Sequence, residues 1–363
     1  MTKPEIRRIL KNTHVLTGVD DRLLVAKGRA LYLYDDRLDK GRLLNELPMT
    51  SAKKALSFLR LGRRLLRLDP TMALPLGTGQ ALILAGSDVW RIDVRSGALE
   101  HEISFAPHKA LNLTRVEGLA GIPDGFYAGA YAYNPQRDPM PIWYRPLHEP
   151  DWQKIYTFPK GTCDHIHNVV ADPYRNCLWV LTGDYDRGAA LWQVRDRFAS
   201  VHPVVSGNQI YRAVWLVPYE DGLLYATDSN IDPNALLFLK EKDGWTLERL
   251  SALPGSSIYA QRWGEGVLFS TTVEPGAPSG RFLYDILDNR RGGGIADASA
   301  HLFFYTRDEG LREILRVPKD AWPMRLFQFG AFQFAQHPTP QKIYAYGIGL
   351  RGYDDATIEL QNT

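Results

Sequence analysis

Cysteine and extended apolar stretches are scarce in this sequence, and both scarcities narrow the class of protein. Its 363 residues contain two cysteines, Cys163 and Cys177, which are too few for a disulfide framework. No stretch reaches about 18 uninterrupted apolar residues, and the opening MTKPEIRRIL lacks the apolar core of a signal peptide. We therefore expect a cytoplasmic protein without a transmembrane segment, in which both thiols are buried and free.

A charge imbalance is lacking too. Lysine and arginine number 43, aspartate and glutamate number 41, and the formal net charge is +2. No overall field attracts nucleic acid or an anionic membrane, so we expect no nucleic-acid partner. By contrast, turn formers and β-favouring residues are plentiful, with 31 glycines, 23 prolines and 11% aromatic residues. This composition favours an all-β fold.

Internal repeats organise the chain. Residues 165–194 align with 210–239 at a constant offset of 45 residues, and both read as strand, Pro-Tyr turn, strand, polar loop, strand. Weaker copies of the same pattern occupy 28–48, 79–105, 113–134, 257–274 (leading to RFLYDIL) and 327–350. A period of about 40–50 residues with several short strands per unit is typical of a β-propeller. We expect a single domain over 1–363 with about seven four-stranded blades, in which EIRRILKN pairs with the last blade.

Two insertions interrupt the repeats. Residues 51–68 contain six basic residues and no acidic residue, and Leu56, Leu59 and Leu66 recur at roughly helical spacing. We expect a solvated connection with a few leucines packed on the propeller; the alternative is a basic amphipathic helix whose residues 53–67 associate with a membrane surface or polyanion. The second insertion, 275–299, carries Arg290 and Arg291 in a glycine-rich stretch. It is either a lid over an anionic ligand or a disordered excursion.

Two histidines share one side of a predicted strand. His165 and His167 are two residues apart, and the hairpin register predicts His165 opposite Asp184 and His167 opposite Thr182. A histidine facing a carboxylate suits a general acid or a metal ligand. The alternative is a structural pair that braces the blade.

Arginines recur at the matching repeat position. The 45-residue offset carries His167 onto Arg212, and the shared glycine of PYEDGL and PDGF carries Arg212 onto Arg115. Guanidinium groups that converge at one channel mouth would bind a carboxylate, sulfate or phosphate. Alternatively, each arginine pairs with a nearby acid such as Glu117 or Asp228.

The loops on the same rim add aromatic rings, carboxylates and amides. These residues are Tyr131, Tyr133, Asp184, Asp186, Asp228, Asn230, Tyr259, Gln261 and Glu274. A sugar ring presents both an apolar face and a hydroxyl edge, so this mixture suits a glycan.

The pattern resembles the sialidase-like, BNR-type propellers. KEKDGWTLE (240–248) is similar to an Asp-box turn between the third and fourth strands, and RSGALE (95–100) is a fainter version. The resemblance implies a rim that binds acidic glycans through Arg115 and Arg212. It also implies Asp184 or Asp228 as the acid and Tyr259 with Glu274 as the nucleophilic pair. No Arg-Ile-Pro motif is present, and the paired histidines resemble propeller-type polysaccharide lyases more than sialidases.

These observations predict a carbohydrate-active enzyme, a glycoside hydrolase or a polysaccharide lyase, that acts on an acidic glycan or glycoconjugate. His165, His167, Asp184, Tyr259 and Glu274 are the predicted catalytic residues. A metal-dependent lactonase is one alternative, because YATDSNID (225–232) is similar to a ligand segment of gluconolactonase-type propellers and Asp228 or Asn230 would hold calcium. The two histidines are candidate zinc ligands, although no metal is required by the pattern. A non-catalytic propeller that binds a glycan or a protein is the third possibility.

Overall fold

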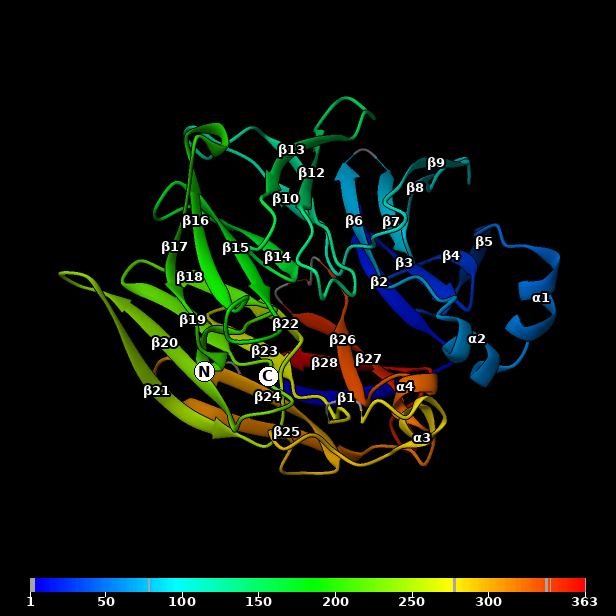
Figure 1. Ribbon diagram of the computed structural model, residues 1–363. Coiled ribbons are helices and arrows are strands. Elements are labelled where there is room, and N and C mark those ends of the chain that lie inside the picture. Colours follow the sequence, from blue (N-terminus) through cyan, green and yellow to red (C-terminus); the bar gives the residue numbers. More distant parts are fainter. Residues whose placement is uncertain (1–3, 78, 277–278, 337–338, 340, 363) are drawn as a thin grey trace. The chain divides into compact units, whose positions relative to one another are not determined.

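The computed structural model forms seven four-stranded sheets and describes residues 4–362 except 78, 277–278, 337–338 and 340 (Figure 1). The fold is an all-β propeller with seven four-stranded blades, which confirms the prediction from the repeats. The chain divides into two compact units, residues 1–101 with 259–363 and residues 102–258. The expectation of one domain over 1–363 stays a prediction. No helix among the described residues is long and apolar enough to cross a lipid bilayer.

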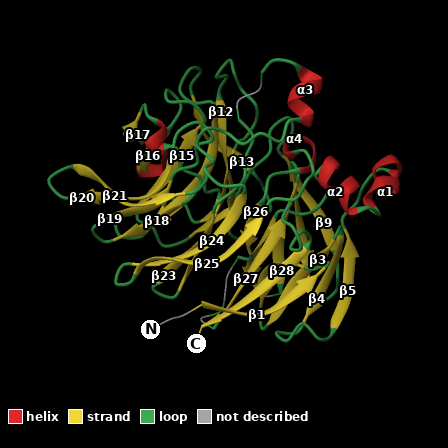
Figure 2. Ribbon diagram, turned by 90° about the horizontal axis from the view of Figure 1, so that it is seen from below, coloured by secondary structure: helices red, strands yellow, loops and turns green. Residues whose placement is uncertain are grey.

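The first unit contains four of the sheets, except that residues 102–104, the end of one strand, belong to the second unit. Their strands are β1 (Pro4–Lys11) with β28 (Ala356–Asn362), β27 (Lys342–Ile348) and β26 (Ala331–Phe334); β2 (His14–Val19), β3 (Arg22–Lys27), β4 (Ala30–Tyr34) and β5 (Gly41–Glu46); β6 (Met72–Gly77), β7 (Gln80–Ala85), β8 (Asp88–Asp93) and β9 (Leu99–Ser104); and β22 (Tyr259–Trp263), β23 (Gly266–Ser270), β24 (Ser299–Thr306) and β25 (Gly310–Pro318). Four short helices belong to the same unit. They are α1 (Ser51–Ser57), α2 (Arg60–Leu66), α3 (Phe282–Leu287) and α4 (Met324–Phe327), drawn in red in Figure 2.

The second unit contains the other three sheets. Their strands are β10 (Thr114–Val116), β11 (Gly125–Gly129), β12 (Met140–Pro146) and β13 (Gln153–Phe158); β14 (His165–Asp172), β15 (Cys177–Gly183), β16 (Ala190–Arg195) and β17 (Ser200–Ser206); and β18 (Leu216–Tyr219), β19 (Gly222–Ala226), β20 (Asn234–Glu241) and β21 (Trp245–Leu253). Two single 3-10 turns, Asp196–Phe198 and Gln209–Tyr211, lie between these strands.

The burial of each strand follows from its place in a sheet. The second strands β15, β19 and β23 are buried at every residue and read as continuous apolar runs such as CLWVL and GLLYA. The fourth strands are only partly buried, and β21 alternates polar with apolar residues as WTLERLSAL. In the second unit, one apolar cluster joins β10–β13 to β14–β17 and another joins β14–β17 to β18–β21. Each sheet thus needs its neighbours to cover both faces, which is why a single repeat is not stable alone.

The predicted connection of the chain ends is confirmed. Strand β1 pairs antiparallel with β28, from Pro4 opposite Asn362 to Lys11 opposite Ala356. The two turns that resemble Asp boxes also lie between the third and fourth strands of their sheets, as expected. Residues 242–244 join β20 to β21, and residues 94–98 join β8 to β9. Asp93 accepts hydrogen bonds from the backbone amides of Arg95 and Ser96 in the second of these turns.

One expected strand is a helix. The segment RFLYDIL was predicted to continue the repeat that begins at 257, but Phe282–Leu287 forms α3, and the third strand of that sheet is β24. Asp285 accepts hydrogen bonds from the backbone amides of Ser279 and Gly280, which fixes the turn that leads into the helix. In this second insertion Arg290 pairs with Asp288, and Arg291 donates to the carbonyl oxygen of Ala296; residues 277–278 lie outside the described residues.

The basic insertion is helical, but its leucines do not all pack inward. Leu56 is 47% exposed and Leu59 is 67% exposed, whereas the guanidinium group of Arg64 is buried. Leu66 is half-buried and Leu68 is buried, so a few leucines of the segment are covered, and Leu56 and Leu59 are not among them.

The two thiols are buried and free, as predicted. Cys177 lies opposite Asp172 in the sheet, also as predicted. Burial, with a nearby carboxylate, raises the pKa of Cys163 and of Cys177 to about 12, so neither thiol is a ready nucleophile.

Candidate functional site

The site is built on the hairpin of β14 and β15 in the second unit. His165 lies opposite Gly183 and Ile166 opposite Thr182, after which a β-bulge at His167 shifts the register before Asn168 pairs with Leu181. The predicted pairs, His165 with Asp184 and His167 with Thr182, are therefore wrong by one residue. The bulge needs one extra residue that no repeat pattern reveals, and it re-aims the His167 side chain.

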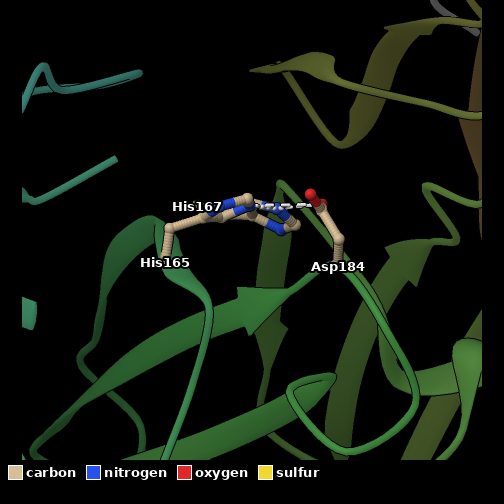
Figure 3. Close-up of side chains that lie close together, drawn as sticks. All are labelled: His165, His167 and Asp184. Carbon is tan, nitrogen blue, oxygen red and sulfur yellow. Dashed lines mark hydrogen bonds and ion pairs between the residues drawn. The ribbon is translucent and has the colours of Figure 1, made fainter. Parts of the chain in front are cut away.

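Because of this bulge, both imidazoles reach the same carboxylate (Figure 3). His165 Nε2 lies 3.0 Å from His167 Nε2 and 3.2 Å from Asp184 Oδ1, and His167 Nε2 lies 3.4 Å from that oxygen. The two histidines are each 3% exposed, while the Asp184 side chain is 31% exposed. Gly183 makes the approach possible, because a β-carbon there would collide with the His167 ring.

The other ring nitrogens define the tautomers. His165 Nδ1 lies 3.1 Å from the carbonyl oxygen of Ala132, and His167 Nδ1 lies 2.9 Å from that of Ala213. A carbonyl oxygen only accepts, so each Nδ1 donates, and in the neutral rings each Nε2 turns a lone pair toward Asp184. Three acceptor atoms then converge on one point.

Electrostatics favour an ionised carboxylate beside neutral imidazole. Burial lowers the pKa of His167, and His165 and Arg212 lower it further, although Asp184 opposes them. Burial of Asp184 disfavours its charge, but its contacts with the two histidines and the charge of Arg212 outweigh burial. The pKa of Asp184 is therefore held well below its usual range.

Arg212 joins the cluster from the neighbouring repeat, as the 45-residue offset predicts. Its Nη2 lies 2.9 Å from Asp184 Oδ1 and 3.4 Å from Asp228 Oδ2, and its Nη1 lies 3.4 Å from Asn230 Oδ1. The predicted alternative, a pair with Asp228, is thus present together with the contact to Asp184. Asp228 and Asn230 both face a guanidinium group.

Tyr131 forms one wall of the cluster. Its ring lies 4.1 Å from the His165 ring between centroids, and the ammonium group of Lys109 lies 5.1 Å from the Tyr131 ring. The backbones of Lys109 and Tyr131 are hydrogen-bonded to each other in an isolated bridge. Tyr131 was predicted at this rim, whereas Lys109 precedes the first strand of its sheet and has no counterpart in the repeats.

Gln209 was also missed. Its amide donates to the carbonyl oxygen of Asp184 at 2.9 Å and accepts from the Ser229 hydroxyl at 3.1 Å, and the residue is 4% exposed. The one signal in the sequence was a glutamine three residues before the repeat arginine.

Arg115 lies elsewhere along its blade. It pairs with Glu117 at 2.6 Å, as the alternative interpretation predicted, and it sits opposite Phe126. The histidines lie next to a different part of that sheet, because the backbone amide of Ile166, the neighbour of His165, donates to the carbonyl oxygen of Ala130. Ala130 is four residues beyond Phe126, which corresponds to about 13 Å of strand. The structure therefore brings Arg212, and not Arg115, to the histidines.

The remaining predicted residues differ in exposure and in the unit to which they belong. Tyr133 is 91% exposed and Asp186 is exposed. Tyr259, Gln261 and Glu274 belong to the first unit, while the cluster is built from residues 102–258 alone. There the Tyr259 hydroxyl accepts from Gln333, and Glu274 accepts from the Thr272 hydroxyl.

The donor set suits a divalent transition metal. Atoms that each lie about 2.0–2.2 Å from one ion are about 3.0–3.4 Å apart in octahedral or tetrahedral geometry, and the three edges measured here are 3.0, 3.2 and 3.4 Å. His165, His167 and Asp184 are the one group of this kind found among the described residues. Two imidazoles and one carboxylate fit Mn²⁺, Fe²⁺ or Zn²⁺ better than Ca²⁺, which prefers oxygen ligands.

Comparison with known proteins supports the β-propeller fold and identifies no family. No protein-family model matches the chain, and no curated protein sequence matches it. Solved structures with a similar fold include an oligogalacturonate lyase in complex with manganese, with TM-score 0.57 and 9% identity over 99% of this chain and 96% of that chain. An oligogalacturonate lyase from Vibrio parahaemolyticus has TM-score 0.52 and 8% identity over 100% and 97% of the two chains. The WD40 propeller domain of Doa1 has TM-score 0.52 and 10% identity over 99% and 97%. Proteins of such different kinds at such low identity support the β-propeller fold alone, and the sialidase-like resemblance gains no family support.

Proposed function

We propose that this chain is a metal-dependent carbohydrate-active enzyme that cleaves an acidic glycan by elimination, as a polysaccharide lyase. The observation that carries the proposal is the convergence of His165 Nε2, His167 Nε2 and Asp184 Oδ1 on one point beside Arg212. Three acceptors so close together repel one another unless a cation lies between them. A uronate is the substrate class, because its carboxylate is attracted to a cation next to a guanidinium group.

The metal would be held by His165, His167 and Asp184. A metal bound there would neutralise the substrate carboxylate and so acidify the hydrogen on the adjacent carbon. The backbone carbonyls of Ala132 and Ala213 fix the two imidazoles from behind, while Arg212 and Gln209 fix Asp184. Arg212 also contributes a second positive charge next to the substrate carboxylate.

Tyr131 is the residue that we assign as the base. Its ring packs on His165 at the partly exposed side of the cluster, and the Lys109 ammonium lies over it. Tyr131, acting as its phenolate, takes the proton from the carbon beside the carboxylate, and the electron pair of the broken C–H bond forms the new C=C bond. The glycosidic C–O bond breaks, and the proton returns to the leaving oxygen.

Elimination is favoured over sialidase-type hydrolysis by the contacts of the expected nucleophilic pair. Tyr259 is engaged by Gln333 and Glu274 by Thr272, so each has its own partner within the first unit. The manganese complex of an oligogalacturonate lyase with this fold is consistent with the lyase hypothesis. A two-histidine, one-carboxylate set also suits manganese.

The test is turnover of uronate-containing oligosaccharides, with oligogalacturonate among them, in the presence of Mn²⁺ or Zn²⁺. We expect an unsaturated product, detected by its ultraviolet absorbance and by mass spectrometry. His165→Ala and Tyr131→Phe should each lower the rate by about 10³-fold or more, because the first removes a metal ligand and the second removes the base.

Tyr133→Phe is the matched control, since that ring is 91% exposed and lies two residues from Tyr131; it should keep full activity. Products that have gained the mass of water would contradict elimination and favour a hydrolase. Stoichiometric binding of a glycan that stays intact would favour the non-catalytic alternative.

A further inference from the structure

Exposed apolar side chains gather on the helices of the first unit. Of the sixteen large hydrophobic side chains that are exposed among the described residues, nine lie on or beside α1, α2, α3 and α4. They are Leu56, Phe58, Leu59, Leu65, Phe282, Leu283, Tyr284, Leu287 and Trp322. We call this set the helical patch. Leaving so much apolar surface in water is unfavourable, and patches of this kind mark interaction sites.

The arginines of α2 hold the helix in one orientation. Arg60 forms ion pairs with Asp69 and Asp354, Arg63 with Asp69 and Asp355, and Arg64 with Asp320. These guanidinium groups point into the first unit, so the opposite side of α1 and α2 points outward. Phe58 and Leu59, at the corner between the helices, are 77% and 67% exposed.

Helix α3 is arranged in the same way. Its one carboxylate, Asp285, turns inward to bind the Ser279 hydroxyl and the Gly280 amide, and it is 8% exposed. Phe282 and Leu283 are then 75% and 71% exposed. Helix α4 contacts both α2 and α3, so the two parts of the helical patch are neighbours on this unit (Figure 2).

The charges around the helical patch are of one kind. The exposed ionised side chains of 51–67 and 279–296 are all cationic: Lys53, Lys54, Arg67, Arg281, Arg290 and Arg291. Asp285 is buried and Asp288, which pairs with Arg290, is mostly covered. Aromatic and leucine side chains surrounded by lysine and arginine match the boundary of an anionic bilayer, where acyl chains meet phosphate groups.

We propose that the helical patch docks this protein on an anionic lipid membrane. Phe58, Leu59, Phe282 and Leu283 enter the acyl boundary, and the lysines and arginines contact lipid phosphates. The glycan site lies on the other unit and is not needed for docking, so the two proposals fail or succeed separately.

The experiment is flotation of the full-length chain with large unilamellar vesicles. We expect the wild type to float with vesicles of phosphatidylcholine and phosphatidylglycerol, and far less with phosphatidylcholine alone. Phe58→Ser with Leu59→Ser should lower the partition coefficient by at least about tenfold, because both side chains leave the acyl boundary. Lys53→Gln with Lys54→Gln should lower it by about fivefold or more, and only on anionic vesicles.

Leu43→Ser is the matched control, because Leu43 is 57% exposed on β5 of the same unit but is not part of the helical patch; its partition should equal that of the wild type. Unchanged thermal unfolding of each variant shows that the fold is intact. Failure of the wild type to float, or equal flotation of all variants, would overturn the proposal. Self-association that only the Phe58→Ser/Leu59→Ser variant loses, without flotation of the wild type, would assign the helical patch to a second copy instead.

Discussion

Two neighbouring repeats of the second unit share a backbone plan and differ in chemistry. In 165–194 and 210–239, the Pro-Tyr turn, the buried second strand and a threonine at its end coincide at the 45-residue offset. His167, however, corresponds to Arg212, and Gly183 corresponds to Asp228. One repeat therefore supplies two imidazoles and a carboxylate, and the next supplies a guanidinium group that reaches the same Asp184. The repeated backbone determines where side chains are placed, and the residue at each place determines the chemistry.

We expect the largest effect on stability from a substitution in the Pro-Tyr turn of 165–194. Asp172 is fully buried and accepts from Trp179 Nε1 at 2.8 Å and from Arg175 Nη1 at 3.1 Å, while Val217 holds the corresponding position. Asp172→Ala should lower the free energy of unfolding by about 3–5 kcal/mol, because the Arg175 charge and the indole N–H lose a buried partner. Val217→Ala, which removes only apolar contacts, should cost about 1–2 kcal/mol. Equal losses in denaturant titrations would show that the two turns are held in the same way.

Arg212 and Arg115 hold corresponding positions in two repeats, and their substitution should affect activity differently. Arg212→Ala should lower turnover of the acidic glycan by about 10²-fold, since both the orientation of Asp184 and a positive charge are lost. Arg115→Ala should stay within about threefold of the wild type, because that side chain pairs with Glu117. Steady-state kinetics on one uronate substrate measure both. A larger loss for Arg115→Ala would move the anion site away from the histidines.

The smallest of these effects concerns Gly183. Gly183→Ala would push the His167 ring away from Asp184, and we expect metal affinity to fall by about tenfold with little change in thermal unfolding. Asp228 holds the position that corresponds to Gly183 in the next repeat, and it is not one of the proposed metal ligands. Asp228→Ala should therefore leave metal affinity within about threefold. Titration calorimetry with Mn²⁺ or Zn²⁺ measures both affinities. Unchanged affinity for Gly183→Ala would mean that His167 is not a ligand.

Much of the fold was predictable because it is repetitive. The offset between 165–194 and 210–239 placed β15, β16, β19 and β20, and the same offset brought Arg212 to the histidines. Asp184 was identified as the carboxylate next to His165 even though the register was wrong by one residue.

The rest depended on tertiary structure. The β-bulge at His167 is set by how β14 packs between its neighbours and leaves no repeat signal. Helix α3 interrupts a repeat with a segment whose apolar residues suit a strand equally well. Lys109 reaches Tyr131 through an isolated bridge outside the regular strands, which no periodicity reports.

The most direct test of the account is the metal content of the purified chain. After removal of metal with a chelator and addition of Mn²⁺ or Zn²⁺, the wild type should bind about one ion per chain and unfold at a higher temperature. His165→Ala with His167→Ala should lose both effects. Absence of binding and of thermal stabilisation in the wild type would contradict the metal site, and calcium bound through Asp228 would favour the lactonase alternative instead.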